Sequence, residues 1–421
     1  MISDKIILNY VVKFEKNVEN MNKYKVRKLF YKSIETELLS IDFDKIYLPK
    51  AIDKYNFNLI KIHSLKAPAA NILKQTALSK GGDLAVSTDV VTCKRDLTDA
   101  ILAVTDKQLK LIIDSLKQQP FGLKKLSSEL EEFLINKLSL SRPLIINNKE
   151  FLWGSKTHLM GILNITPDSF SDGGEYLCID NAVKCVSEMI KNNVDIIDIG
   201  GESTRPFSEP VEPDIQIKRI KPIIKEIRAQ FPDTVISVDT RSNIVANCAI
   251  EIGASIINDV SGLTFDSEMV SVVASNNIPL IIMHSQGTPE TMQNMPAYNN
   301  LLDDICSFLF DQIDYAITHG VKESNIIIDP GIGFGKTINN NLEIIQRISE
   351  IKSLGYPTLV GTSRKNFIGK LLNEEVYNRE EGTLATNAYL VSQGVDILRI
   401  HDISYHAKAI KMLDHISRTN F

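Results

Sequence analysis

Short apolar runs alternate with longer mixed stretches from residue 157 to the end of the chain. Each run has the length of a buried strand, and the residues after it suffice for an amphipathic helix, which is the pattern of repeated βα units. The predicted strands are His158–Ile165, Asp195–Gly201, Val235–Thr240, Ile256–Val260, Leu280–Ser285, Asn325–Gly331, Pro357–Ser363 and Ile397–Asp402.

Eight such units favour a (β/α)8 TIM barrel, which usually contains roughly 250 residues. The alternative, a doubly wound sheet, would need a Gly-x-Gly-x-x-Gly turn after an early strand, and the sequence has none there. We therefore predict an α/β fold with a TIM barrel over residues 151–421.

Residues 1–150 differ from the rest, with only Gly81, Gly82 and Gly122 among them as glycines. They mix strand-like runs with helical stretches, so we predict a smaller α+β accessory domain over residues 1–150, with a linker at Ser141–Pro143. The predicted strands are Lys5–Val12, Lys45–Leu48, Leu59–His63 and Leu84–Val91, and the predicted helices are Asp106–Lys117 and Leu123–Leu138.

Composition excludes several classes of protein. The net charge is −5 with 24% charged residues, and no basic patch suggests a nucleic-acid partner. The apolar stretches are far shorter than the ~20 residues of a membrane helix, and the first residues show no signal-peptide pattern. Five scattered cysteines without Cys-x-x-Cys spacing indicate neither a disulfide frame nor a zinc site. We expect a cytoplasmic protein that binds neither membrane nor nucleic acid.

Polar side chains stand at the carboxyl ends of the predicted strands. In a TIM barrel these ends converge on one rim, so the side chains would line a single pocket. They include Asn164, Glu202–Arg205, Asp239, Asn258, Asp259, His284, Asp329, Ser363–Lys365, Arg399 and His401.

Two of these residues suit a phosphate group. Arg399 and His401 are two apart on the last predicted strand, so their side chains point the same way. A guanidinium offers forked donors to phosphate oxygens, and an imidazole can add one more. The glycines at 331, 333 and 335 also suggest a phosphate loop, but this spacing is a weak signal that also marks tight turns.

Five segments carry most of the polar residues and glycines at the predicted strand ends: 161–174, Gly200–Pro206, Asp329–Lys336, Gly361–Gly369 and Arg399–Asp402. Together these segments resemble the dihydropteroate synthase family. The resemblance implies that a pterin methylene diphosphate is joined to p-aminobenzoate, with release of diphosphate and with Mg²⁺ as cofactor, in a homodimer.

The resemblance assigns the pterin half of the site. Asp329 would accept hydrogen bonds from the N–H edge of the pterin, with Asp239 and Asn258 as partners, since a carboxylate suits a paired donor edge. Asp239 would also stabilise positive charge on the pterin methylene. Lys365 would donate to the ring carbonyl and a ring nitrogen. The walls of the slot would be Met283, Gly333 and Phe334.

The resemblance also assigns the diphosphate half. Asn164 would bind the Mg²⁺ that accompanies the diphosphate, because this hard cation takes few protein oxygens and completes its shell with phosphate and water. Thr204 would add a diphosphate contact beside Arg399 and His401.

Two mobile loops, Thr166–Gly174 and 203–209, would close over p-aminobenzoate. Phe170 and Pro206 would enclose its ring, and Asp172 and Arg205 would stabilise the closed arrangement. The chain departs from the family pattern twice near the carboxylate of p-aminobenzoate, where Phe207 replaces a common glycine and Asn366 a common serine. These departures bear on the binding of p-aminobenzoate and of sulfonamides.

Two other functions are compatible with parts of the pattern. A pterin-binding methyltransferase barrel would share the Asp and Asn contacts but would lack the Thr-Pro-Asp-Ser-Phe and Ser-Thr-Arg-Pro loops of this chain. A non-catalytic pterin-binding subunit would not need the combination of Asn164, Lys365, Arg399 and His401. Both alternatives are less consistent with the sequence than a synthase.

Overall fold

The computed structural model describes residues 26–29, 34–92, 94–139, 143–165, 174–202, 208, 210–287 and 297–419. The chain forms two compact units, one extending to Glu131 and the other from Glu132 to Asn420. The predicted strand Lys5–Val12 lies outside the described residues. Among those described, no helix is long and apolar enough to cross a membrane.

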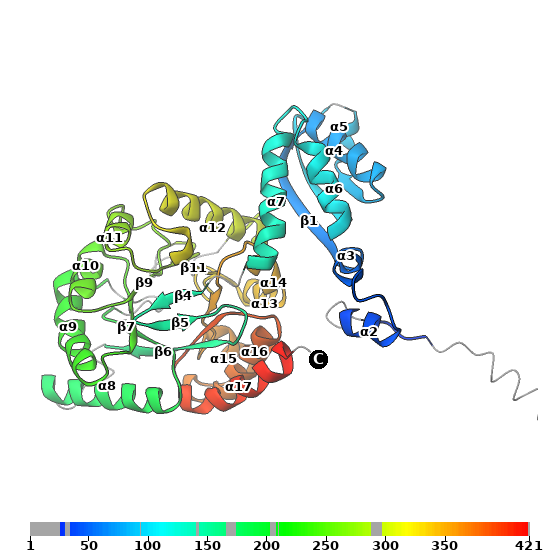
Figure 1. The fold of residues 1–421 in the computed structure, drawn as a ribbon. Helices are drawn as coiled ribbons and strands as arrows, with labels where there is room; N and C mark the ends of the chain where they lie inside the picture. Colours follow the sequence, from blue (N-terminus) through cyan, green and yellow to red (C-terminus); the bar gives the residue numbers. More distant parts are fainter. Residues whose placement is uncertain are drawn as a thin grey trace, which may run out of the picture. The chain divides into compact units, whose positions relative to one another are not determined.

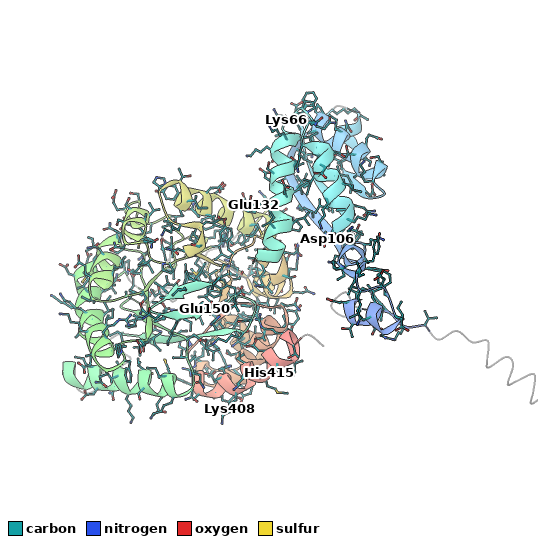
Figure 2. The ribbon with its side chains drawn as sticks, viewed as in Figure 1. Lys66, Asp106, Glu132, Glu150, Lys408 and His415 are labelled. Carbon is teal, nitrogen blue, oxygen red and sulfur yellow. The ribbon has the colours of Figure 1, made fainter. Side chains whose placement is uncertain are left out.

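The first unit is an α+β fold, as predicted. Its sheet has the antiparallel order β1-β3-β2, and α4 and α6 pack against it. Lys66 and Asp106 mark opposite ends of this sheet (Figure 2), since Lys66 closes β1 and Asp106 follows the last residue of β3. The elements are α2 (Ile34–Ser40), α3 (Leu48–Ile52), β1 (Phe57–Lys66), α4 (Ala67–Ser79), β2 (Asp83–Val86), α5 (Thr88–Val91), β3 (Leu97–Thr105), α6 (Asp106–Leu116) and the first half of α7 (Leu123–Ser139), which continues past Glu131 into the second unit.

Three sequence predictions for this unit need correction. Lys45–Leu48 is not a strand, because Lys45–Tyr47 form a turn and Leu48 begins α3. The run Leu84–Val91 splits at Ser87, which caps the amino end of α5. Strand β3 was not predicted at all, and it is the central strand of the sheet.

The second unit is a closed TIM barrel, and all eight strands predicted for it are confirmed (Figure 1). The strands are parallel in the order β11-β10-β9-β8-β7-β6-β13-β12, and a parallel bridge between Ile328 and Thr358 closes the circle. The strands are β6 (His158–Asn164), β7 (Ile196–Gly200), β8 (Val235–Asp239), β9 (Ile256–Asp259), β10 (Leu280–Met283), β11 (Ile326–Asp329), β12 (Leu359–Val360) and β13 (Ile397–Ile400).

Helices surround the barrel because alternate strand residues point outward and are apolar. Ile197 and Ile199 of β7, for example, are fully buried in the large cluster that joins the strands to the helices. The helices are α8 (Gly174–Lys191), α9 (Pro213–Gln230), α10 (Asn243–Glu251), α11 (Met269–Asn276), α12 (Leu301–Thr318), α13 (Ile338–Gln346), α14 (Ile348–Lys352), α15 (Asn366–Leu372), α16 (Glu380–Ser392) and α17 (Ile403–Arg418).

A short hairpin closes the amino end of the barrel. Its strands β4 (Leu144–Ile146) and β5 (Lys149–Phe151) pack with Trp153 on the lowest inward layer of the barrel. The members of that layer are Met160, Ile196, Val235, Ile256, Ile281, Ile327, Leu359 and Ile397. The hairpin therefore belongs with the barrel, and the boundary that we predicted at residue 150 falls inside it.

Candidate functional site

A polar layer lies inside the barrel, directly above the apolar floor. On β7, β8, β9, β11 and β13 it lies two residues beyond a floor residue, so the side chains point inward. Asp198, Ser237 and Asn258 occupy this layer and are at most 2% exposed. Met283, Asp329 and Arg399 hold the same position on β10, β11 and β13. Residues with hydrogen-bonding side chains thus replace the hydrocarbon floor toward the carboxyl ends of the strands.

Arg399 links Asp198 of this layer to Asp239, the next inward residue after Ser237 on β8. Its Nε donates to Oδ2 of Asp198 over 2.6 Å, and its Nη2 donates to Oδ2 of Asp239 over 2.7 Å. The amide of Asn258 donates to the same oxygen of Asp198 over 3.3 Å. Hydrogen bonds between charged groups in a buried site are strong and directional, so this arrangement fixes the guanidinium inside the barrel.

Several oxygens around Arg399 remain without partners. Oδ1 of Asp198, Oδ1 of Asp239, Oδ1 of Asn258 and Oγ of Ser237 are buried and have no hydrogen-bond partner among the residues that the structure describes. A buried acceptor without a donor costs free energy, about 1–3 kcal/mol for each group. The barrel interior therefore presents a set of acceptors that suits a ligand rich in N–H donors.

Two carboxyl groups of the site titrate near neutrality. Burial raises the pKa of Asp239 to about 7, an effect that Arg399 opposes and the charge of Asp198 reinforces. Burial also raises the pKa of Asp329 to about 6, against the opposing effect of the Gly331 N–H, which donates to its Oδ1 over 2.7 Å. Carboxyl groups whose pKa values are raised toward neutral pH occur frequently at functional sites.

An apolar wall stands beside these polar groups. Met283, Val260 and Phe334 form a buried cluster. The ammonium of Lys365 lies 4.1 Å from the centroid of the Phe334 ring, at a distance typical of a cation–π contact. A Cβ on Gly333 would lie 3.3 Å from the Lys365 side chain, so a glycine keeps room for it.

The glycine loop after β11 packs tightly on the end of β10. A Cβ on Gly331, whose φ is +67°, would lie 2.0 Å from the carbonyl oxygen of His284, so only glycine fits. Lys336 closes the loop from within: its Nζ lies 2.9 Å from Nδ1 of His284 and donates to the carbonyl of Phe334 over 3.0 Å. Burial lowers the pKa of Lys336 to about 7, and burial together with Lys336 lowers the pKa of His284.

Three predicted site residues lie at the rim. Asn164 ends β6 in register with Gly200, which is itself paired with Asp239. Nδ1 of His401 shares a hydrogen bond of 3.0 Å with the hydroxyl of Ser363. Asn366 is exposed at the start of α15.

The structure thus brings together the predicted pterin residues Asp239, Asn258, Met283, Asp329, Gly333, Phe334 and Lys365. Arg399 joins this group directly, because two of its donors engage carboxylates of the barrel interior. The remaining predicted residues, Phe170, Asp172, Thr204, Arg205 and Pro206, lie outside the described residues, and so does Phe207.

Sequence reasoning missed Asp198 and Lys336. It searched the ends of strands, whereas Asp198 stands in the middle of β7, inside the apolar run Ile-Ile-Asp-Ile-Gly. A single acid at an inward position of a buried strand was the signal that could have identified it. Lys336 was visible as the end of the glycine loop, but its burial depends on contacts with β10 that the sequence does not specify.

Comparison with known proteins agrees with this geometry. Residues 160–401 match the family model described as pterin binding enzyme. A dihydropteroate synthase of Clostridium beijerinckii is 49% identical over 274 residues, which cover 65% of this chain and 99% of that protein. The chain belongs to the dihydropteroate synthase family.

Solved structures of the family extend the likeness to the fold. The synthase of Clostridium difficile, solved in the presence of pteroic acid, is 42% identical with a TM-score of 0.60, over 63% of this chain and 99% of its own. The synthase of Xanthomonas albilineans with 4-aminobenzoic acid is 32% identical with a TM-score of 0.62, over 66% and 99% of the two chains. The protein is therefore a dihydropteroate synthase, a transferase of folate biosynthesis.

Proposed function

We propose that the polar layer around Arg399 binds the pterin ring of 6-hydroxymethyl-7,8-dihydropterin diphosphate. The unpartnered oxygens of Asp239 and Asn258 carry this proposal, because a pterin presents a row of N–H donors and these acceptors lie buried beside one another. Asp329, buried at the end of β11, supplies a third acceptor. Met283 and Phe334 give the flat ring an apolar surface on which to lie.

Lys365 completes the slot from above. Its ammonium stands over Phe334 at the edge of the apolar wall, and from there it donates to the ring carbonyl and a ring nitrogen of the pterin. A charged donor at this point fixes the orientation of the ring and so holds the methylene group in one place.

The diphosphate lies toward the rim in this proposal. His401 and Asn164 stand at the carboxyl ends of β13 and β6, and Arg399 is fixed below them by Asp198 and Asp239. The amide oxygen of Asn164 would be a protein ligand of Mg²⁺, since one protein oxygen suits a cation whose other ligands are phosphate and water. The bound ion would neutralise negative charge on the departing diphosphate.

The pterin methylene carries positive charge in this mechanism before the amine attacks. p-Aminobenzoate is a weak nucleophile, so the bond to diphosphate breaks early, and the carboxylate of Asp239 stabilises the cation. Thr204, Phe170, Asp172, Arg205 and Pro206 are proposed to hold diphosphate and p-aminobenzoate, on the family resemblance alone.

We further propose that the synthase is a cytoplasmic homodimer. Among the described residues Cys185, Cys248 and Cys306 are free thiols, in keeping with a reducing compartment. Gel filtration with light scattering tests the dimer. The decisive experiment on activity is detection of 7,8-dihydropteroate from the two substrates with Mg²⁺, with omission of each substrate as the control. No product with the full chain would refute the proposed reaction.

A further inference from the structure

The turn that carries Lys365 is held in an unusual backbone conformation. Arg364, the residue before it, has φ +56°, in the left-handed region that residues other than glycine rarely adopt. Such a conformation persists only where the surrounding structure holds it in place, and it is frequent at ligand sites. The turn follows β12, and Lys365 is the N-cap residue of α15.

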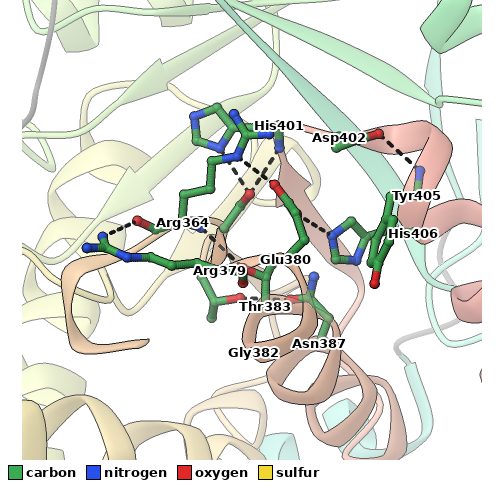
Figure 3. Close-up of polar contacts among 12 residues, drawn as sticks. Arg364, Arg379, Glu380, Gly382, Thr383, Asn387, His401, Asp402, Tyr405 and His406 are labelled. Carbon is green, nitrogen blue, oxygen red and sulfur yellow. Dashed lines mark hydrogen bonds and ion pairs between the residues drawn. The ribbon is translucent and has the colours of Figure 1, made fainter. Parts of the chain in front are cut away.

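Helix α16 holds this turn at several points. Asn387 accepts from the hydroxyl of Thr362 over 2.8 Å, and Thr383 Oγ1 accepts from the backbone N–H of Arg364 over 3.2 Å. Figure 3 shows Glu380 between the side chains of Arg364 and His406, which approach its two carboxylate oxygens to 2.6 and 3.1 Å. The backbone and side chain of Arg364 are thus both anchored to one helix.

Arg379, at the start of α16, completes the arrangement. Its Nη1 donates to the carbonyl of Arg364 over 3.1 Å, and its Nε donates to the carbonyl of Glu374, beyond the end of α15, also over 3.1 Å. The guanidinium lies against Gly369 in the middle of α15, where a Cβ would come within 2.2 Å of its Nε. One guanidinium therefore joins the turn, α15 and the chain that leaves α15.

We propose that Arg379 is a positioning residue of the synthase, which sets the place of Lys365 by holding the Arg364 carbonyl and α15 in a fixed relation. Arg379 itself lies behind the turn and reaches the reaction only through Lys365. The inference rests on the role proposed for Lys365 in the pterin slot. A lysine cannot replace this guanidinium, because a single ammonium cannot donate to both carbonyls in the way that the planar, forked guanidinium does.

The barrel contains a matched control at its opposite end. Arg228 of α9 also lies against a glycine, where a Cβ on Gly253 would come within 2.9 Å of its Nε, and it also donates to carbonyls, those of Gly253 and Thr234. These carbonyls precede β8 and β9, at the amino ends of the strands, away from the site. Arg228→Lys therefore removes a similar buried contact without touching the Lys365 turn.

The test measures kcat/KM for the pterin diphosphate in the wild-type protein and in four full-length variants: Arg379→Lys, Lys365→Ala, the double variant, and Arg228→Lys. We expect Arg379→Lys to lower kcat/KM about tenfold in the wild-type background and less than about twofold in the Lys365→Ala background, since a residue that acts through Lys365 has no effect without it. Arg228→Lys is expected to lower the unfolding midpoint while kcat/KM stays within about twofold.

The same fold loss from Arg379→Lys in both backgrounds would overturn the proposal, because Arg379 would then act on the site independently of Lys365. Wild-type kcat/KM in Lys365→Ala would instead refute the role of Lys365 itself, and with it the basis of the inference. If Arg379→Lys does not fold, Thr383→Val removes the acceptor of the Arg364 N–H and takes its place in the same comparison. Failure of both variants to fold would show that Arg379 is required for folding, and it would overturn the positioning role.

Discussion

Arg399 and Asp198 form a buried ion pair at the centre of the barrel, with Nε and Oδ2 2.6 Å apart. Asp198 is fully buried, and the same oxygen also accepts from the amide of Asn258. Asp239 accepts the other edge of the guanidinium. The guanidinium of Arg399 is consequently held between two acids. Its orientation depends on Asp198, which lies in the middle of its strand and does not reach the rim.

Replacement of Asp198 by asparagine is expected to lower kcat/KM by about 10- to 100-fold. The amide keeps the shape of the side chain but removes the charge, and a hydrogen bond to a charged group contributes about 1.5–3 kcal/mol. Asp195→Asn is the matched control, because Asp195 pairs with Lys156 at the amino end of the same strand. Steady-state kinetics of both variants decide the point, and equal kcat/KM values would mean that Arg399 does not need Asp198.

The pH profile of kcat/KM should have an acid limb between about pH 6 and 7. Asp239 and Asp329 offer acceptors on both carboxylate oxygens only when ionised, and their pKa values are raised to about 7 and about 6. Protonation as the pH falls through these values turns one oxygen of each group into a donor and removes the negative charge, so kcat/KM falls. In Asp198→Asn a neighbouring negative charge is lost, so the pKa of Asp239 falls and the limb moves to lower pH. A limb that moves to higher pH would contradict this electrostatic coupling.

Lys365→Ala should cost about 2–4 kcal/mol of transition-state stabilisation, since it removes a charged donor to the pterin and leaves ring acceptors unpaired. The measurement is kcat/KM for the pterin diphosphate. Lys370→Ala is a suitable control, because Lys370 is exposed one turn further along α15. Equal values for the two variants would show that Lys365 does not contact the pterin.

The sequence predicted the barrel strands well because a strand covered on both faces is a continuous apolar run. It failed for β3, which carries apolar residues on both faces: Ala100, Leu102 and Val104 are buried, whereas Leu97 and Ile101 are exposed. The sequence of this strand therefore shows no alternation of apolar and polar positions. It also missed the hairpin, because strands of three residues are too short to show a period. Asp239, Asn258, Asp329 and Lys365 were predictable, since the fold alone brings strand ends together.

The pairing within the site was not predictable in the same way. The contact of Arg399 with Asp198 joins residues 201 positions apart and depends on the stagger between strands of the closed barrel. The fixed turn at Arg364 depends on α16, which follows later in the chain. Residue types can indicate the chemistry of a site, but such contacts need the three-dimensional arrangement.

A fragment that begins at Pro143 is expected to fold and to keep synthase activity, whereas one that begins at Lys149 should be less stable. The shorter fragment loses β4, which contributes Leu144 and Ile146 to the barrel floor. It also loses Asn147, which donates to the Thr234 carbonyl and the Ser255 hydroxyl. Burial of the two apolar side chains contributes about 1.5–3 kcal/mol each. Urea unfolding compares the two fragments, and equal midpoints would show that the hairpin does not stabilise the barrel.

The last prediction concerns Lys336, which is buried against His284 with its Nζ 2.9 Å from the ring. Burial lowers the pKa of Lys336 to about 7, well below its value in the unfolded chain. Between pH 7 and about pH 10 the unfolded chain therefore binds a proton that the folded chain has lost. It follows that the free energy of unfolding rises with pH in this window, by up to about 1.4 kcal/mol per unit. Below pH 7 Lys336 is protonated in both states and adds no pH dependence.

Lys336→Met removes that contribution while keeping the length of the side chain. Comparison of the two proteins by urea unfolding at pH 7 and pH 9 cancels the titration of the groups that Lys336 does not influence, so the wild type should gain about 2 kcal/mol over the variant between the two pH values. Parallel pH dependences would mean that Lys336 stays charged in the folded protein. In that case its ammonium, rather than a neutral amine, would hold the carbonyl of Phe334, and the loop beside the pterin slot would keep its hydrogen bonds at every pH in the range.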